Sequence, residues 1–104
     1  LLSDPEVILM EKRIGVIAIL VKDKASIPKL NTIISSHCDI VLGRQGMPLR
    51  DRGVNIISLI VEGTTDQIGS AAGKIGRLQG VQVKSVLTSY KEREDEDGDS
   101  NATT

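Results

Sequence analysis

Two stretches of the chain are almost continuously apolar and rich in β-branched residues. They are Arg13–Lys22 and Val54–Glu62, and their length and composition are typical of strands buried on both faces. Asp39–Leu42 predicts a shorter strand that could extend toward Leu49. Val81–Thr88 alternates in part between apolar and polar residues, which is typical of an edge strand.

Helical spacing occurs twice between these strands. The first helix is expected over Ile27–His37, with Ser26 as its N-cap and Pro28 in its first turn. The second is expected to begin at Thr64, because Thr64 and Gln67 form a capping-box pattern. Its apolar face is expected to carry Ile68, Ala71, Ala72, Ile75 and Leu78.

Glycine is unusually frequent in the second helix. Gly69, Gly73 and Gly76 each cost ~1 kcal/mol relative to alanine, so we expect them to leave a slim helix that packs closely. Gly80 is expected to supply the turn into the last strand.

The elements follow the order strand, helix, strand, strand, helix, strand, so a strand-helix-strand unit occurs twice. Right-handed crossovers leave few topologies for this order. The one we expect is an α+β, ferredoxin-like βαββαβ sandwich, in which a four-stranded antiparallel sheet carries both helices on one face. In that fold the first and third strands are central, and they are the two most apolar strands here.

The uncovered face of such a sheet would also be apolar. The sequence does not decide which side that is, because both sides of the two central strands are apolar. The first strand offers Ile14, Val16, Ala18 and Leu20 on one side and Ile17, Ile19 and Val21 on the other, and the third offers Ile56 and Ile60 on one side and Ile57, Leu59 and Val61 on the other. Burying each large side chain contributes ~1.5–3 kcal/mol, so we expect homo-oligomers that associate through the sheet. The alternative is that residues 1–9 or the C-terminal tail cover this face.

Composition divides the chain into three parts. Residues 1–10 precede the periodic pattern, and either Met10 is an original start or Pro5–Leu9 is an extra edge strand. Residues 11–90 form the expected domain. Residues 91–104 carry six acidic and two basic side chains, which predicts an acidic disordered tail. The other 90 residues hold eight acidic and eleven basic side chains, too small an excess to indicate nucleic-acid binding.

The sequence favours a cytoplasmic protein. Its longest apolar run, Ile14–Val21, has eight residues, against the ~18–20 of a membrane span. No cationic segment leads into an apolar stretch with a cleavage site. The single cysteine, Cys38, cannot form an internal disulfide.

The sequence contains no complete motif for catalysis or metal binding. Gly73-Lys74 lacks both the hydroxyl residue and the earlier glycine of a phosphate loop. His37 and Cys38 are too few for zinc unless subunits share a site, so we expect His37 to end the first helix and Cys38 to be buried. Without a paired acid–base or nucleophile constellation, we expect no enzyme, no cofactor and no metal.

The segment Gly43–Gly53 is the most distinctive part of the chain and is expected to be an irregular hairpin connection. Its arginines could clasp an anionic ligand, because guanidinium matches carboxylate or phosphate. Alternatively they are tip charges paired with Asp51 or with a neighbouring subunit. The candidate ligand-binding residues are Arg44, Gly46, Arg50, Arg52 and Asn55.

Four segments together resemble one known family: Lys12–Val21, the Gly43–Gly53 hairpin, Asn55–Val61 and Gly73–Val81. The resemblance covers roughly residues 11–89 and is to the family named as regulators of the iron-only hydrogenase system in anaerobic bacteria. It implies an ACT-like form of the ferredoxin-like fold, related to the C-terminal domain of the nickel-responsive repressor.

The chain departs from relatives of this fold at three points. The nickel repressor uses several histidines and a cysteine, whereas this chain has one of each, so nickel sensing is not implied. Nine residues before Met10 are too few for the repressor's ribbon-helix-helix segment. The Lys22–Ala25 loop, near which ACT domains often hold an amino acid, lacks the glycine that lets a ligand approach the backbone.

We therefore expect a non-enzymatic regulatory module that binds a small anionic effector or a protein partner between subunits and acts in hydrogenase expression or maturation. It would be a dimer or tetramer, and we expect neither membrane nor nucleic-acid binding by this chain alone. Two alternatives stay open: a purely structural interaction module without ligand, and a DNA-associated transcriptional regulator.

Overall fold

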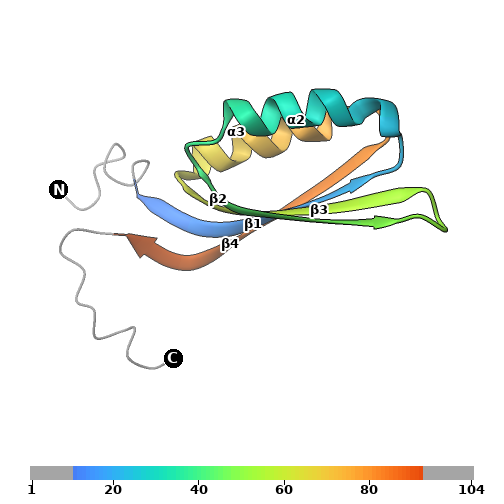
Figure 1. Cartoon of the computed structure of the whole chain (residues 1–104). Helices are drawn as coiled ribbons and strands as arrows, with labels where there is room; N and C mark the ends of the chain where they lie inside the picture. Colours follow the sequence, from blue (N-terminus) through green and yellow to red (C-terminus); the bar gives the residue numbers. More distant parts are fainter. Residues whose placement is uncertain (1–10, 93–104) are drawn as a thin grey trace.

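The sheet is built around two central strands in the computed structural model, which describes residues 11–92 (Figure 1). Its strand order is β2-β3-β1-β4, and every neighbouring pair is antiparallel. Both helices lie on one face, with a short 3₁₀ turn, η1, before the first of them. The elements are β1 (Lys12–Val21), η1 (Lys24–Ser26), α2 (Ile27–Ser36), β2 (Val41–Leu49), β3 (Val54–Gly63), α3 (Thr65–Gly76) and β4 (Val81–Glu92). The expected βαββαβ sandwich is confirmed.

The core lies between the sheet and the two helices. Alternate residues of the central strands point into it, because successive side chains of a strand face opposite sides. Each fully buried aliphatic side chain there contributes ~1.5–3 kcal/mol, and this layer holds the helices on the sheet. The buried apolar residues are Ile17, Ile19, Val21, Leu30, Ile34, Ile40, Ile57, Leu59, Val61, Ile68, Ala71, Ile75 and Val81.

The second strand extends to Leu49, which is one of the two possibilities that the sequence left open. Gly43–Leu49 is therefore strand rather than part of an irregular hairpin connection, and only Arg50–Gly53 forms the turn. Pro48 is tolerated because β2 is an edge strand, where a missing ladder N–H costs little. Gly53 has a φ of 67°, which supplies the left-handed position of the turn.

The start of the first helix also differs from the expectation. Ser26 is the N-cap residue of α2, but its side chain makes no capping hydrogen bond. Instead its buried hydroxyl donates to the carbonyl oxygen of Gln79 at 2.7 Å. Asp23 does the capping one turn earlier, where its Oδ1 accepts from the N–H of Ala25. Ser26 therefore ties the start of α2 to the connection that leads into β4.

The capping box of α3 is confirmed. The Thr64 hydroxyl accepts from the backbone N–H of Gln67 at 3.1 Å, and the Gln67 side chain accepts from the N–H of Thr64 at 2.9 Å. The expected close packing of the helix glycines holds for Gly76 alone, where an added Cβ would lie 2.9 Å from Val83. A Cβ added at Gly69 or Gly73 would meet no atom within 4 Å among the described residues, so close packing is not seen there.

The interpretations of the two chain ends lie outside the described residues. These are the N-terminal extension over residues 1–10, the alternative edge strand Pro5–Leu9, and the acidic tail beyond residue 92. β4 runs to Glu92, two residues past the expected end of the domain. Within residues 11–92, no helix is long and apolar enough to cross a membrane.

Candidate functional site: the open sheet face and the β2–β3 hairpin

The face of the sheet that lies opposite the helices, here called the open face, is built by the other set of alternating residues. The register places Val16 of β1 between Ile60 of β3 and Val86 of β4. Two positions along, Ala18 lies between Ser58 and Lys84 in the same way.

The next row along the strands continues the apolar surface. Leu20 of β1 pairs with Ile56 of β3, and Ile56 pairs in turn with Met47 of β2. The open face therefore carries rows of large apolar side chains on either side of the small pair Ser58 and Ala18.

Several of these side chains are exposed although they are large and apolar. Val16 is 40% exposed, Ile60 47%, Val86 66%, Ile56 36% and Met47 61%. Single exposed aliphatic residues are ordinary, but these lie in adjacent register positions and form one surface. The sequence pattern predicts apolar residues on both sides of β1 and β3 without deciding which side the helices cover, and it does not predict the contributions of Met47 and Val86.

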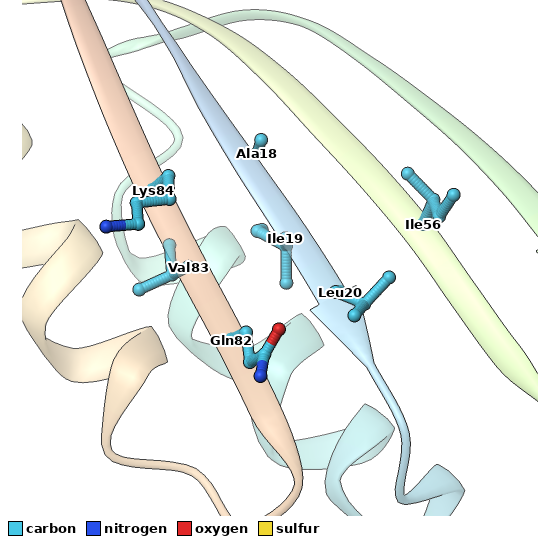
Figure 2. A pocket seen from close by; sticks show the side chains of 7 residues that line it. All are labelled: Ala18, Ile19, Leu20, Ile56, Gln82, Val83 and Lys84. Atoms are coloured by element: carbon cyan, nitrogen blue, oxygen red, sulfur yellow. The ribbon is translucent and has the colours of Figure 1, made fainter.

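A hollow of about 210 Å³ lies on this face above Ala18 (Figure 2). Ala18 is short, and the longer side chains of Leu20 and Ile56 rise beside it, with Gln82 and Lys84 on the β4 side. No sequence motif indicates such a hollow, because it arises from the size of residues that meet only across strands.

Two charged residues flank the apolar rows. Glu62 of β3 pairs with Ile14 and is half-buried, while Lys84 of β4 pairs with Ala18 and is exposed. Neither forms an ion pair within the part of the chain that the structure describes.

The arginines of the hairpin do not converge within one chain. Arg44 pairs across from Leu59, points to the helix side, and donates to the Asn31 side chain of α2 at 2.8 Å. Leu49, the last residue of β2, lies five strand positions or about 16 Å from Arg44, and Arg50 follows it in the turn.

Two of the remaining candidate residues, Gly46 and Asn55, lie between Arg44 and Arg50. Gly46 pairs with Ile57, and an added Cβ there would meet nothing closer than 3.9 Å. Asn55 is half-buried and pairs with both Pro48 and Val21. Arg52 lies in the turn with Arg50, and neither arginine makes an ion pair among residues 11–92. Pairing with Asp51 is therefore not seen in the described part of a single chain.

His37 and Cys38 lie at the end of α2. His37 is the C-cap residue, as expected, and its Nδ1 lies 3.0 Å from the carbonyl oxygen of Ile33. Cys38 is exposed, so the expectation of a buried thiol is wrong. His37, Asp39 and Asp66 line a hollow of about 260 Å³, but no group of three or more metal-ligating side chains able to hold an ion occurs among residues 11–92.

The sequence matches one protein-family model over residues 13–85. That family is TM1266-like, with the description "Iron-only hydrogenase system regulator, putative". No curated protein matches the sequence.

Among solved structures, the chain is similar to uncharacterized protein TM1266 from Thermotoga maritima, with 32% identity and a TM-score of 0.71 over 74% of this chain and 98% of that one. It is also similar to the ACT domain from GTP pyrophosphokinase of Chlorobium tepidum, with 20% identity and a TM-score of 0.62 over 72% and 99%. The C-terminal domain of the MgtC protein from Mycobacterium tuberculosis gives 12% identity and a TM-score of 0.58 over 88% and 99%. The last two similarities concern the fold alone, which is ACT-like.

Proposed function

Because the chain belongs to the TM1266-like family of iron-only hydrogenase system regulators, we propose that it is a regulatory module that acts as a homo-oligomer and binds an anionic effector without catalysing a reaction. The open face is the observation that supports association. Its exposed apolar residues occupy neighbouring positions on all four strands, and monomeric proteins rarely leave such a surface in water. A second copy of the same sheet has the matching chemistry.

The β2–β3 hairpin is the proposed effector site. Arg50 and Arg52 have no ion-pair partner among the described residues, and guanidinium groups in that state are available to carboxylate or phosphate. Arg44, held by Asn31, contributes a second contact further along β2, with Gly46 and Asn55 between them. A site of this length favours an extended or multiply charged anion over a small monoanion.

Association is tested by placing a charge in the apolar surface. Ile60→Asp introduces a carboxylate beside Val16 and should shift the full chain to monomers in sedimentation equilibrium, since burying an unpaired charge is costly. Lys29→Asp changes an exposed position on α2 and serves as the matched control, with no expected effect. A wild-type chain that is monomeric at high concentration would refute the association.

Effector binding is tested by removing two arginines. A thermal-shift screen of the wild type with tricarboxylates, nucleotides and inorganic phosphate should find a stabilising anion, because a ligand at 100 times its Kd stabilises by ~2.7 kcal/mol. Arg44→Ala with Arg50→Ala should abolish that shift, whereas Lys29→Ala with Arg77→Ala, which removes the same charge elsewhere, should keep it. No stabilising anion would favour the purely structural module, and steeply salt-dependent retention on duplex DNA would favour a DNA-associated regulator.

A further inference from the structure

We propose that two copies meet face to face across Val16, so that each Glu62 pairs with the partner's Lys84 and each Ile60 enters the partner's hollow above Ala18. This inference rests on the proposed association through the open face and specifies its geometry. It names a register and a pair of charges that neither the apolar pattern nor the family description provides.

The strand register determines where Glu62 and Lys84 lie relative to Val16. Glu62 is opposite Ile14, two positions before Val16 along β1 and one strand to the β3 side. Lys84 is opposite Ala18, two positions after Val16 and one strand to the β4 side. The two charges are therefore displaced from Val16 by equal amounts in opposite directions, about 13 Å apart along the strands and about 10 Å apart across them.

This placement is self-complementary. A two-fold axis that lies between the two sheets, above Val16 and perpendicular to the line from Glu62 to Lys84, exchanges those two positions. Homodimer interfaces of this isologous kind use each contact twice, so one axis produces two identical Glu–Lys pairs. The strands of the two sheets then cross steeply, closer to the orthogonal class of sheet packing than to the aligned class.

The same axis also matches a large residue with a small one. Ile60 lies one strand from Val16, about 5 Å away, and Ala18 lies two positions along, about 7 Å away. Rotation about the axis brings Ile60 to within about 3 Å of the position above the partner's Ala18 on a flat lattice of these spacings. Ile60 is 47% exposed and free to enter the hollow of about 210 Å³ that Ala18 leaves beside Leu20 and Ile56 (Figure 2).

The charges have a physical role in this arrangement. Neither Glu62 nor Lys84 has an ion-pair partner within residues 11–92, so each is available to a second copy. Sheets pack about 10 Å apart, a gap that a lysine and a glutamate can bridge together from opposite sides. Charges at the rim of an apolar interface mainly fix register and exclude misaligned pairings, which a flat apolar surface cannot do by itself.

Charge reversal with rescue tests the register. Glu62→Lys and Lys84→Glu should each weaken the dimer of the full chain by tenfold or more in sedimentation equilibrium, since each places two like-charged pairs at the interface. The double variant should return the dissociation constant to within about threefold of the wild type, because the pair is restored with opposite polarity. Asp66→Lys and Lys74→Glu, on the outer part of α3, are the matched controls and should leave the dimer unchanged.

Filling the hollow tests the second contact. Ala18→Leu adds apolar surface to the open face, so unspecific hydrophobic association would become tighter. The proposed register predicts the opposite, a dimer weakened by tenfold or more, because the partner's Ile60 no longer fits. Circular dichroism of each variant at low concentration checks that the monomer is still folded.

The outcomes separate this register from the association itself. If Ile60→Asp dissociates the dimer while both charge reversals leave it intact, or the double variant does not rescue it, the open face is the interface and the proposed register is wrong. If Ile60→Asp has no effect on a stable oligomer, another surface associates and both proposals are overturned. A monomeric wild type, with the open face free for another protein or a small molecule, also overturns both.

Discussion

The two faces of the sheet use the same strands and nearly the same residue types, yet they differ completely in exposure. Ile17 and Leu59 are 0% and 2% exposed on the helix side, whereas Val16 and Ile60, their neighbours in sequence, are 40% and 47% exposed on the open face. The alternation of a strand assigns each residue to a face, but only the helices decide which face becomes a core. An apolar strand residue is therefore a core residue of this chain on one face and an interface candidate on the other.

The largest expected effect comes from truncating one residue on each face. Ile17→Ala should lower the free energy of unfolding by about 2–5 kcal/mol, because it leaves a cavity under the helices. Val16→Ala should change the stability of the monomer by less than about 1 kcal/mol. Urea denaturation at a concentration where the wild type is dissociated measures both, and equal losses would contradict the distinction between the faces.

The next largest loss of stability is expected at Gly80, in the connection between α3 and β4. Gly80 has a φ of 71°, and an added Cβ would lie 2.5 Å from the Cβ of Asp23, so Gly80→Ala should destabilise by about 1–3 kcal/mol. Gly53→Ala has a similar φ but open space around it, and should cost less, about 1 kcal/mol. Thermal unfolding of the two variants compares them, and a larger loss at Gly53 would contradict the packing argument.

A smaller effect is expected at the start of α3. Thr64→Ala removes the hydroxyl that accepts from the N–H of Gln67, and should cost about 1 kcal/mol. Thr64→Ser keeps the oxygen and should retain most of the stability. If the serine variant is as unstable as the alanine variant, the loss arises from packing rather than from the cap.

The smallest expected effect is a gain in stability, and it distinguishes the exposed side of α3 from the side that packs on the sheet. Gly69→Ala and Gly73→Ala should each stabilise by up to about 1 kcal/mol, because an added methyl group meets nothing and helix propensity rises. Gly76→Ala should gain less or lose stability, because its Cβ would lie 2.9 Å from Val83. Destabilisation by Gly69→Ala would show that a partner covers this outer surface.

Much of the fold follows from local patterns in the sequence. The positions of β1 and β3, the capping box at Thr64 and the turn at Gly80 each have a local physical cause, and each was predicted correctly. The expectation that these two strands are buried on both faces is not met within one chain, where only the helix side is buried. The family resemblance is confirmed as well, over residues 13–85.

The sequence patterns were wrong or undecided where a contact between residues far apart in the sequence determines the local structure. Ser26 has an ordinary capping position but bonds to Gln79, 53 residues away. For Gly43–Leu49, with its two glycines and a proline, the sequence left an irregular connection and an extended strand both open, and pairing with β3 decides for the strand. The hollow above Ala18 depends on the sizes of side chains from three strands, and a local sequence pattern cannot predict which of these side chains meet. The hairpin residues Arg44 and Arg50 remain predicted as an anion site, and their separation along β2 is visible only in the structure.

The proposed difference between the covered and open faces is that the open face mediates self-association of the chain. Sedimentation equilibrium of the full chain over a wide concentration range measures this directly. We predict a reversible dimer, or a tetramer built from it, that Ile60→Asp converts to monomers. A wild-type chain that stays monomeric at the highest concentration would contradict it.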